Sequence, residues 1–249
     1  IWHQEIEDIL VLKNNKGTED NRVRKLDYSI QISKLFYERF IKNADITLFS
    51  PNHVPGLYEA FGMPEFDSLY LKYEKDKSIP KSTIGAQELF QALLKERAET
   101  GRIYIMNLDH CNTHSSFKDK VYMSNLCQEI TLPTTPIQHI DDKEGEIALC
   151  ILSAINLGLL TDMNELEELC DLSVRALDEI IDYQEYPVEA AKISTQARRS
   201  LGIGYIGLAH YLAKNQVSYE DKKALKIVDK VTEAFQFYLL KASNNLAKE

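Results

Sequence analysis

Hydrophobic and polar positions along the chain predict many helices and a few short strands. Apolar residues recur at helical spacing over 84–98, where Leu89, Phe90 and Leu93 would share one face, and over 162–183. Pro187 is suited to the first turn of a further helix. By the same criterion, the predicted helices cover residues 3–13, 27–42, 84–98, 162–183, 187–199, 204–214 and 220–247.

Strands are predicted where short apolar or β-branched runs are bounded by turn residues, as at 46–49 and 102–107. The almost wholly apolar run 146–153 is typical of a strand buried on both faces. The polar run 109–114 is predicted to be a loop, and 125–132 to be extended or loop. A few buried strands among many helices indicate an α/β fold, part of a barrel or wound sheet, with a helix-rich second half.

Composition narrows the possible partners. The 249 residues are 44% hydrophobic, which suffices for a buried core, and the formal net charge is −9. This charge, with no local run of Lys or Arg, argues against a nucleic-acid surface. No apolar run approaches the length of a membrane span, so we expect a cytoplasmic protein that contacts neither nucleic acid nor membrane.

The four cysteines, Cys111, Cys127, Cys150 and Cys170, include no CxxC pair, so no zinc site is predicted. A low cysteine count suits a reducing compartment. Cys170 lies within a predicted amphipathic helix, and Cys111 in a polar run; both are interpreted as small buried hydrophobes. Cys127 and Cys150 stand in contexts that indicate chemistry.

Cys127 is flanked by an amide and a carboxylate at alternate positions, in the run Ser124–Ile130 (SNLCQEI). In a straight strand, Asn125, Cys127 and Glu129 would share one face but spread over roughly 13 Å. They can converge on one small ligand only if the segment curls. The alternative is an ordinary strand with Leu126 and Ile130 in the core.

The stretches SNLCQEI and LCILSAINLG (149–158) together resemble the catalytic core of ribonucleotide reductase, specifically the class I large subunit. The resemblance continues in family order through LKNN (12–15), ITLFSP (46–51), TGRIY (100–104), DHCNTHS (109–115), GEIALC (145–150) and RRSLGIG (198–204). It covers essentially the whole chain.

The resemblance implies a role for each matching residue. Cys127 matches the cysteine that holds the thiyl radical, and Glu129 the carboxylate that takes the proton of the ribose 3′-hydroxyl. Asn125 matches the amide that binds substrate hydroxyls, and Ser124 is expected to bind substrate beside it. Cys150 matches one of two reducing cysteines; its disulfide partner is expected outside residues 1–249.

The resemblance also implies the setting. The family fold is a ten-stranded α/β barrel with the catalytic loop threaded into it, and residues 1–249 would be a middle segment, incomplete at both ends and inactive alone. The expected reaction reduces ribonucleoside diphosphates. Expected partners are a diiron-tyrosyl small subunit that supplies the radical, thioredoxin or glutaredoxin, and a second large subunit. No cofactor is expected within the segment, and ATP and dNTP effectors should bind mainly outside it.

Three alternatives remain open. The chain could be an inert helical interaction module of the same fold. Residues Gly202–Gly207 satisfy GxGxxG, the dinucleotide fingerprint of NAD-dependent dehydrogenases, which requires a preceding strand. Residues 196–200 instead indicate a helix, so glycines for close helix packing are the favoured explanation. His110 and His114, with Asp109, could bind a metal on a helix, but a hydrogen-bonded loop is favoured.

Overall fold

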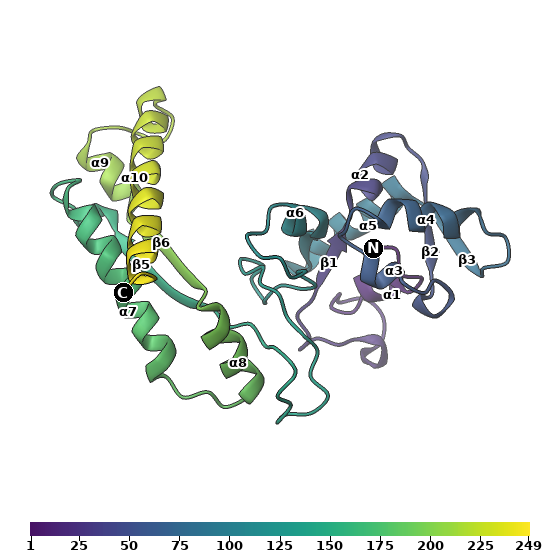
Figure 1. Cartoon of the computed structure of the whole chain (residues 1–249). Coiled ribbons are helices and arrows are strands. Elements are labelled where there is room, and N and C mark those ends of the chain that lie inside the picture. Colours follow the sequence, from purple (N-terminus) through teal and green to yellow (C-terminus); the bar gives the residue numbers. More distant parts are fainter. The chain divides into compact units, whose positions relative to one another are not determined.

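A computed structural model gives the backbone of residues 1–249 and the side chains of all of these except Asn21. The chain divides into two compact units, Ile1–Thr134 and Thr135–Glu249. Helices and strands occur in both units (Figure 1), which confirms the predicted α/β class.

The first unit contains two 3₁₀ helices, six α-helices and four strands among its described residues. In chain order its elements are α1 (Ile6–Leu10), η1 (Glu19–Asn21), β1 (Ser29–Ile32), α2 (Lys34–Ile41), β2 (Asp45–Phe49), η2 (Pro51–His53), α3 (Leu57–Ala60), α4 (Phe66–Lys75), β3 (Lys81–Gly85), α5 (Ala86–Thr100), β4 (Tyr104–Asn107) and α6 (Leu108–Thr113).

The four strands of this unit form two separate pairs. β1 and β4 are parallel, with Ser29 opposite Tyr104 and Ile32 opposite Asn107. β2 and β3 are antiparallel. A parallel bridge between His3 and Phe49 joins the N-terminal segment to β2.

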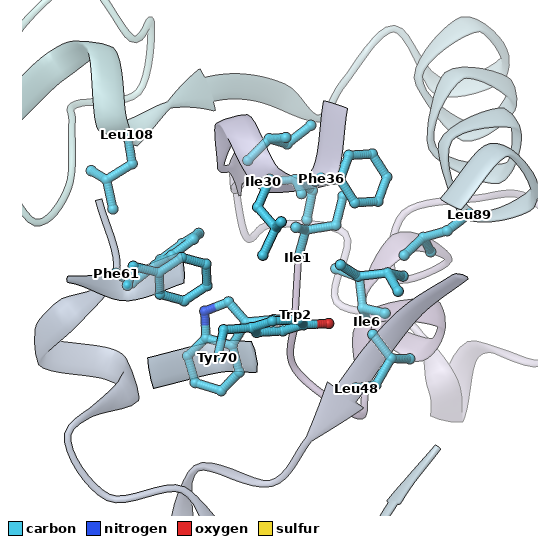
Figure 2. Close-up of a cluster of buried hydrophobic side chains, with 14 of the residues drawn as sticks. Ile1, Trp2, Ile6, Ile30, Phe36, Leu48, Phe61, Tyr70, Leu89 and Leu108 are labelled. Atoms are coloured by element: carbon cyan, nitrogen blue, oxygen red, sulfur yellow. The ribbon is translucent and has the colours of Figure 1, made fainter. Parts of the chain in front are cut away.

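One continuous hydrophobic core holds the first unit together (Figure 2), with Trp2, Phe36 and Leu89 buried in it. Aromatic rings meet edge-on in this core: the centroids of Phe49 and Tyr70 lie 5.5 Å apart. The Tyr70 hydroxyl accepts a hydrogen bond from the Thr47 amide and donates one to the Thr47 carbonyl, so its only polar atom is satisfied despite burial.

The second unit is helix-rich, as predicted. Its elements are β5 (Ile151–Asn156), η3 (Leu157–Leu159), α7 (Glu165–Tyr183), α8 (Glu189–Arg198), β6 (Leu201–Ile206), α9 (Leu208–Lys214) and α10 (Lys222–Leu246). β5 and β6 are parallel, from Ile151 opposite Leu201 to Asn156 opposite Ile206. Helix α7 packs against both strands and against α10.

The buried face of α7 carries the predicted apolar stripe, with Leu166, Val174, Leu177 and Ile181 all buried. Cys170 is also fully buried on this face, which confirms its interpretation as a small hydrophobe. Burial raises the pKa of its thiol to about 11, so this group stays protonated and inert near neutral pH.

Four predicted elements are wrong in part. The first two residues of the predicted helix 84–98 belong to β3. Residues 29–32, at the start of the predicted helix 27–42, form β1, and residues 204–206 of the predicted helix 204–214 belong to β6. The strand predicted at 146–153 instead spans Ile151–Asn156. It is not buried on both faces, because alternate side chains such as Leu152 are exposed; its one hydrogen-bonded neighbour is β6.

The strands of the described residues form three separate two-stranded sheets, so no closed barrel is present in this part of the molecule. None of the described helices combines the length and the apolar character that crossing a membrane requires.

Candidate active site

Residues Ser124–Ile130 form a curled turn in the first unit, as the spacing of Asn125, Cys127 and Glu129 requires. The Gln128 amide donates to the Asn125 carbonyl at 3.2 Å, and Gln128 itself has a left-handed φ of 67°. That conformation is uncommon for a residue other than glycine and occurs where the surroundings enforce it. The ordinary strand is therefore excluded here.

Side chains of the turn close it internally. The Asn125 Oδ1 atom accepts the Ile130 amide at 3.1 Å, and the Ser124 hydroxyl donates to the Ile130 carbonyl. The Gln128 side chain donates to the Asn125 carbonyl at 2.9 Å, while its buried Oε1 has no hydrogen-bond partner among the described residues. Since Oδ1 of Asn125 is occupied, its Nδ2 group is the end that can be offered to a ligand.

Cys127 and Glu129 both face solvent from this turn. A free, accessible thiol beside a carboxylate can give up a hydrogen atom or react with another thiol, whereas a buried thiol cannot. The polar atoms of Ser124 and Asn125 shape the loop around these two groups.

Cys150 lies in the second unit, immediately before β5, and is also a free, exposed thiol. Exposed and buried positions alternate along β5, with Ile151 and Ile155 buried and Leu152 exposed. Cys150 is two residues before Leu152 and is exposed like it, as the two-residue period of a strand predicts for side chains on one face.

An ion pair anchors the segment that leads to Cys150. The Glu146 carboxylate accepts a hydrogen bond from Nη2 of Arg198 at 2.6 Å. Both side chains are largely shielded from solvent. Glu146 also forms an antiparallel bridge with Thr135, and the Ile147 amide donates to the Ala190 carbonyl in α8. These contacts fix the path of the chain four residues before the thiol.

The motif 109–115 proves to be helical at its start, which corrects the predicted loop. Residues 108–113 form α6, and from this helix Asp109 and Asn112 bind backbone groups outside it. The Asp109 carboxylate accepts the Lys34 amide at 2.7 Å, at the start of α2. Cys111 is half-buried against the core of the first unit, and burial raises the pKa of its thiol.

Among the described residues, no three His, Cys, Asp or Glu side chains are grouped so that they could hold a metal ion. His110 and His114 contact each other edge-on, with centroids 5.7 Å apart. The Nδ1 atom of His114 is within hydrogen-bonding distance of the His110 carbonyl and the Thr113 hydroxyl.

The glycines at 202–207 lack the dinucleotide-binding arrangement. Helix α8 ends at Arg198, and Gly202 and Gly204 lie inside strand β6 instead of in a turn after it. Close helix packing is also wrong as their explanation: a Cβ at Gly202 would meet Leu152 of the neighbouring strand at 2.5 Å. Gly207, with φ of 74°, makes the turn into α9.

Comparison with known proteins identifies the relationship. The family model described as "Ribonucleotide reductase, barrel domain" matches residues 1–249. The chain belongs to the ribonucleotide reductase barrel-domain family. It is 61% identical to the ribonucleoside-diphosphate reductase subunit alpha of Haemophilus influenzae and 59% identical to that of Buchnera aphidicola from Schizaphis graminum.

A third relative, the ribonucleoside-diphosphate reductase 1 subunit alpha of Escherichia coli, is 58% identical. Each of the three alignments covers all of this chain and about a third of the relative, 33% or 34%. The chain therefore corresponds to one segment of these ribonucleotide reductase subunits, and the family resemblance inferred from the motifs is confirmed.

Sequence reasoning missed the residues that support the turn. Asn112 and Gln31 both form hydrogen bonds to the backbone just before it. Asn112 lies in a motif that was noticed, but its role depends on the helical conformation of α6. Gln31 carried no signal, because it lies within a segment predicted as helix.

Proposed function

We propose that this chain is the catalytic-core segment of a ribonucleoside-diphosphate reductase large subunit, which replaces the ribose 2′-hydroxyl of ribonucleotides by hydrogen for DNA synthesis. What supports the proposal is that, in a member of this family, SNLCQEI forms a curled turn with an exposed thiol and carboxylate. An ordinary strand at this position would have favoured the inert module.

The chemistry assigns a task to each residue. The 2′-hydroxyl is a poor leaving group, and a radical at C3′ weakens its bond to carbon. The thiyl radical of Cys127 takes the hydrogen atom from C3′, and Glu129 accepts the proton of the 3′-hydroxyl. The Nδ2 group of Asn125 and the Ser124 region hold the substrate hydroxyls. Asn125 and Ser124 also keep the turn closed.

Reduction then requires two electrons. The 2′-oxygen leaves as water after protonation, and two thiols supply the electrons and become a disulfide. Cys150 is one of these thiols, and its partner is a cysteine outside residues 1–249. The proposal therefore requires Cys127 and Cys150 to approach the same sugar in the complete enzyme, within a ten-stranded barrel into which the turn is threaded.

The proposal extends to the partners of the complete enzyme. A class I small subunit with a diiron-tyrosyl centre supplies the radical, thioredoxin or glutaredoxin restores the thiols, and the large subunit forms a homodimer. ATP and dNTP effectors bind mainly outside this segment. Alone, the 249 residues lack a second reducing thiol and a radical source, and should not turn over.

The experiment is ribonucleotide reduction by a full-length large subunit carrying this segment, with its small subunit and dithiothreitol. Wild type should convert CDP to dCDP, and Cys127→Ser should be inactive because a serine oxygen radical is much harder to generate. Glu129→Gln should bind CDP but turn it over slowly, because an amide cannot accept the proton. Normal turnover by Cys127→Ser would refute the proposal.

A further inference from the structure

The stem that leads into the turn of Cys127 starts at a buried residue, Val121, that one side chain holds. Val121 is fully buried, and both of its backbone polar groups bond to Asn112. Its amide donates to Asn112 Oδ1 at 2.8 Å, and its carbonyl accepts Asn112 Nδ2 at 3.0 Å. The side-chain amide of Asn112 therefore satisfies both the N–H and the C=O of Val121, as the backbone of a neighbouring β-strand would.

A second amide holds the next residue along. The Gln31 Nε2 group of β1 donates to the Tyr122 carbonyl at 2.6 Å. Asn112 therefore fixes Val121, six positions before Cys127, to α6. Gln31 fixes Tyr122, five positions before Cys127, to β1. Both supports belong to the first unit, so they and the turn form one connected structure.

The crowding around Asn112 shows that its orientation is fixed. Nδ2 also donates to the Leu108 carbonyl at 3.2 Å, so three hydrogen bonds determine the amide plane. A Cβ at Gly62 would lie 3.1 Å from Nδ2 and 2.5 Å from the Leu108 side chain. Gly62 has φ of 82°, and its missing side chain leaves room for the amide.

Beyond this stem, residues 124–130 are closed on themselves by Ser124 and Asn125. A loop that is rigid within itself moves as a unit with its stem. A shift at Val121 would therefore displace the Cys127 thiol without unfolding the turn. Hydrogen abstraction is sensitive to such a shift, because a misplacement of about 1 Å can cost on the order of 100-fold in rate.

We infer that Asn112, assisted by Gln31, is a positioning residue that places the Cys127 thiol against the substrate by clamping Val121 and Tyr122. This inference rests on the proposed function of Cys127. Asn112 does not touch substrate in this account; it acts through the backbone of the turn.

The test compares Asn112→Ala with Thr113→Val in the full-length enzyme with its small subunit. Thr113 is the matched control, since the hydrogen-bond partners of its hydroxyl are the Asp109 carbonyl and His114 Nδ1, both in the same motif and outside residues 121–130. Asn112→Ala should lower kcat for CDP by about 10- to 100-fold, because the thiol is displaced. KM should stay within about twofold and Thr113→Val should keep wild-type kcat.

Base release separates hydrogen abstraction by Cys127 from the reduction steps that follow it. In the Cys150→Ser background, cytosine release reports hydrogen abstraction by Cys127 without the reduction that follows. Asn112→Ala added to that background should slow cytosine release as much as it lowers kcat in the wild type. Unchanged release would contradict positioning of Cys127, even if dCDP formation fell.

Gln31→Met keeps the inference testable if Asn112→Ala does not fold. It removes the bond to the Tyr122 carbonyl, together with a longer contact to the Met106 sulfur, and should lower kcat in the same direction by a smaller factor. If Cys127→Ser is inactive while Asn112→Ala, or Gln31→Met in its place, keeps wild-type kcat, the positioning inference is wrong and the proposed function stands. If Cys127→Ser is active, the proposed function itself fails.

Discussion

The segments that carry Cys127 and Cys150 are held in different ways, although both thiols are exposed. Cys127 stands on a turn whose own side chains close it and whose stem is clamped by neutral amides. Cys150 stands at the end of an extended segment that is anchored four residues earlier by an ion pair to α8.

This difference matches the two proposed tasks. Hydrogen abstraction requires a thiol fixed within a fraction of an ångström, because the reacting atoms must be close and aligned. A reducing thiol must instead form a disulfide and later be attacked by an external thiol, which requires access and some freedom to move. The comparison suggests that rigidity was concentrated at Val121–Ile130.

Replacing each thiol by serine should separate the two tasks most strongly. In the full-length enzyme with its small subunit, Cys127→Ser should abolish both dCDP formation and cytosine release, because no step begins. Cys150→Ser should abolish dCDP formation but still release cytosine, since abstraction proceeds and the intermediate then decomposes. Cytosine release from Cys127→Ser, combined with normal reduction by Cys150→Ser, would mean that the two roles are reversed.

Gly62→Ala should affect the Cys127 side of the comparison next most strongly. At φ of 82° a side chain costs about 1–2 kcal/mol, and crowding against Leu108 and Asn112 adds about 1–3 kcal/mol. Both stability, from urea unfolding, and kcat should fall.

Gly101→Ala is the matched control for this change. Gly101 has φ of 64°, but a Cβ there would have no neighbour within 4 Å among the described atoms. It should show the backbone cost alone, with kcat unchanged. Equal loss of kcat in the two variants would argue that Gly62 has no special connection to the turn.

The curled turn could be predicted from sequence because its argument was local. Asn125, Cys127 and Glu129 lie too far apart in a straight strand to meet one ligand, and the motif suggested that they do. The apolar stripe of α7 was predictable for a similar reason: its period of 3.6 residues is expressed within one element.

The supports of the turn could not be predicted, because they depend on partners distant in sequence. β1 was assigned to a helix since Ile30 and Ile32 fit a helical pattern continued by α2; pairing with β4, about 75 residues later, makes the segment a strand. Asn112 looked like a loop residue because asparagine favours turns. Its bonds to Val121 appear only once α6 is folded.

Weakening the ion pair that anchors the Cys150 segment should have a moderate effect on reduction and spare hydrogen abstraction, unlike changes at the Cys127 turn. Glu146→Gln removes the negative charge that accepts the hydrogen bond from Arg198. It should destabilise the second unit by about 1–2 kcal/mol, as expected for a hydrogen bond to a charged group. Because abstraction by Cys127 is spared, the ratio of cytosine released to dCDP formed should rise. Asn112→Ala should instead lower both products together.

Asp171→Asn is the control for the ion pair at Glu146. Asp171 pairs with Arg175 one turn along α7, where both side chains are more than a third exposed, so its loss should cost less than about 1 kcal/mol. The product ratio of this variant should equal that of wild type. A raised ratio in Asp171→Asn would show that general loosening of the second unit, not the anchor at Glu146, controls Cys150.

The smallest expected effect concerns the acid stability of the first unit. Burial acts to raise the pKa of the Glu74 carboxyl, but hydrogen bonds from Arg39 and Thr47 outweigh it and lower the pKa below its ordinary value of 4.5. A carboxyl with a lowered folded-state pKa contributes stability that is complete above the ordinary pKa and is lost as the pH falls through the folded-state value.

The urea midpoint of wild type should therefore exceed that of Glu74→Gln by a constant amount between pH 6 and 7, and the difference should shrink below about pH 4.5. Thr47→Val, which removes one of these hydrogen bonds, should reduce the acid sensitivity in the same direction by less. A difference between wild type and Glu74→Gln that is independent of pH would show that Glu74 supports the first unit by packing and not by its charge. At neutral pH, Glu74→Gln should keep wild-type kcat, unlike Asn112→Ala.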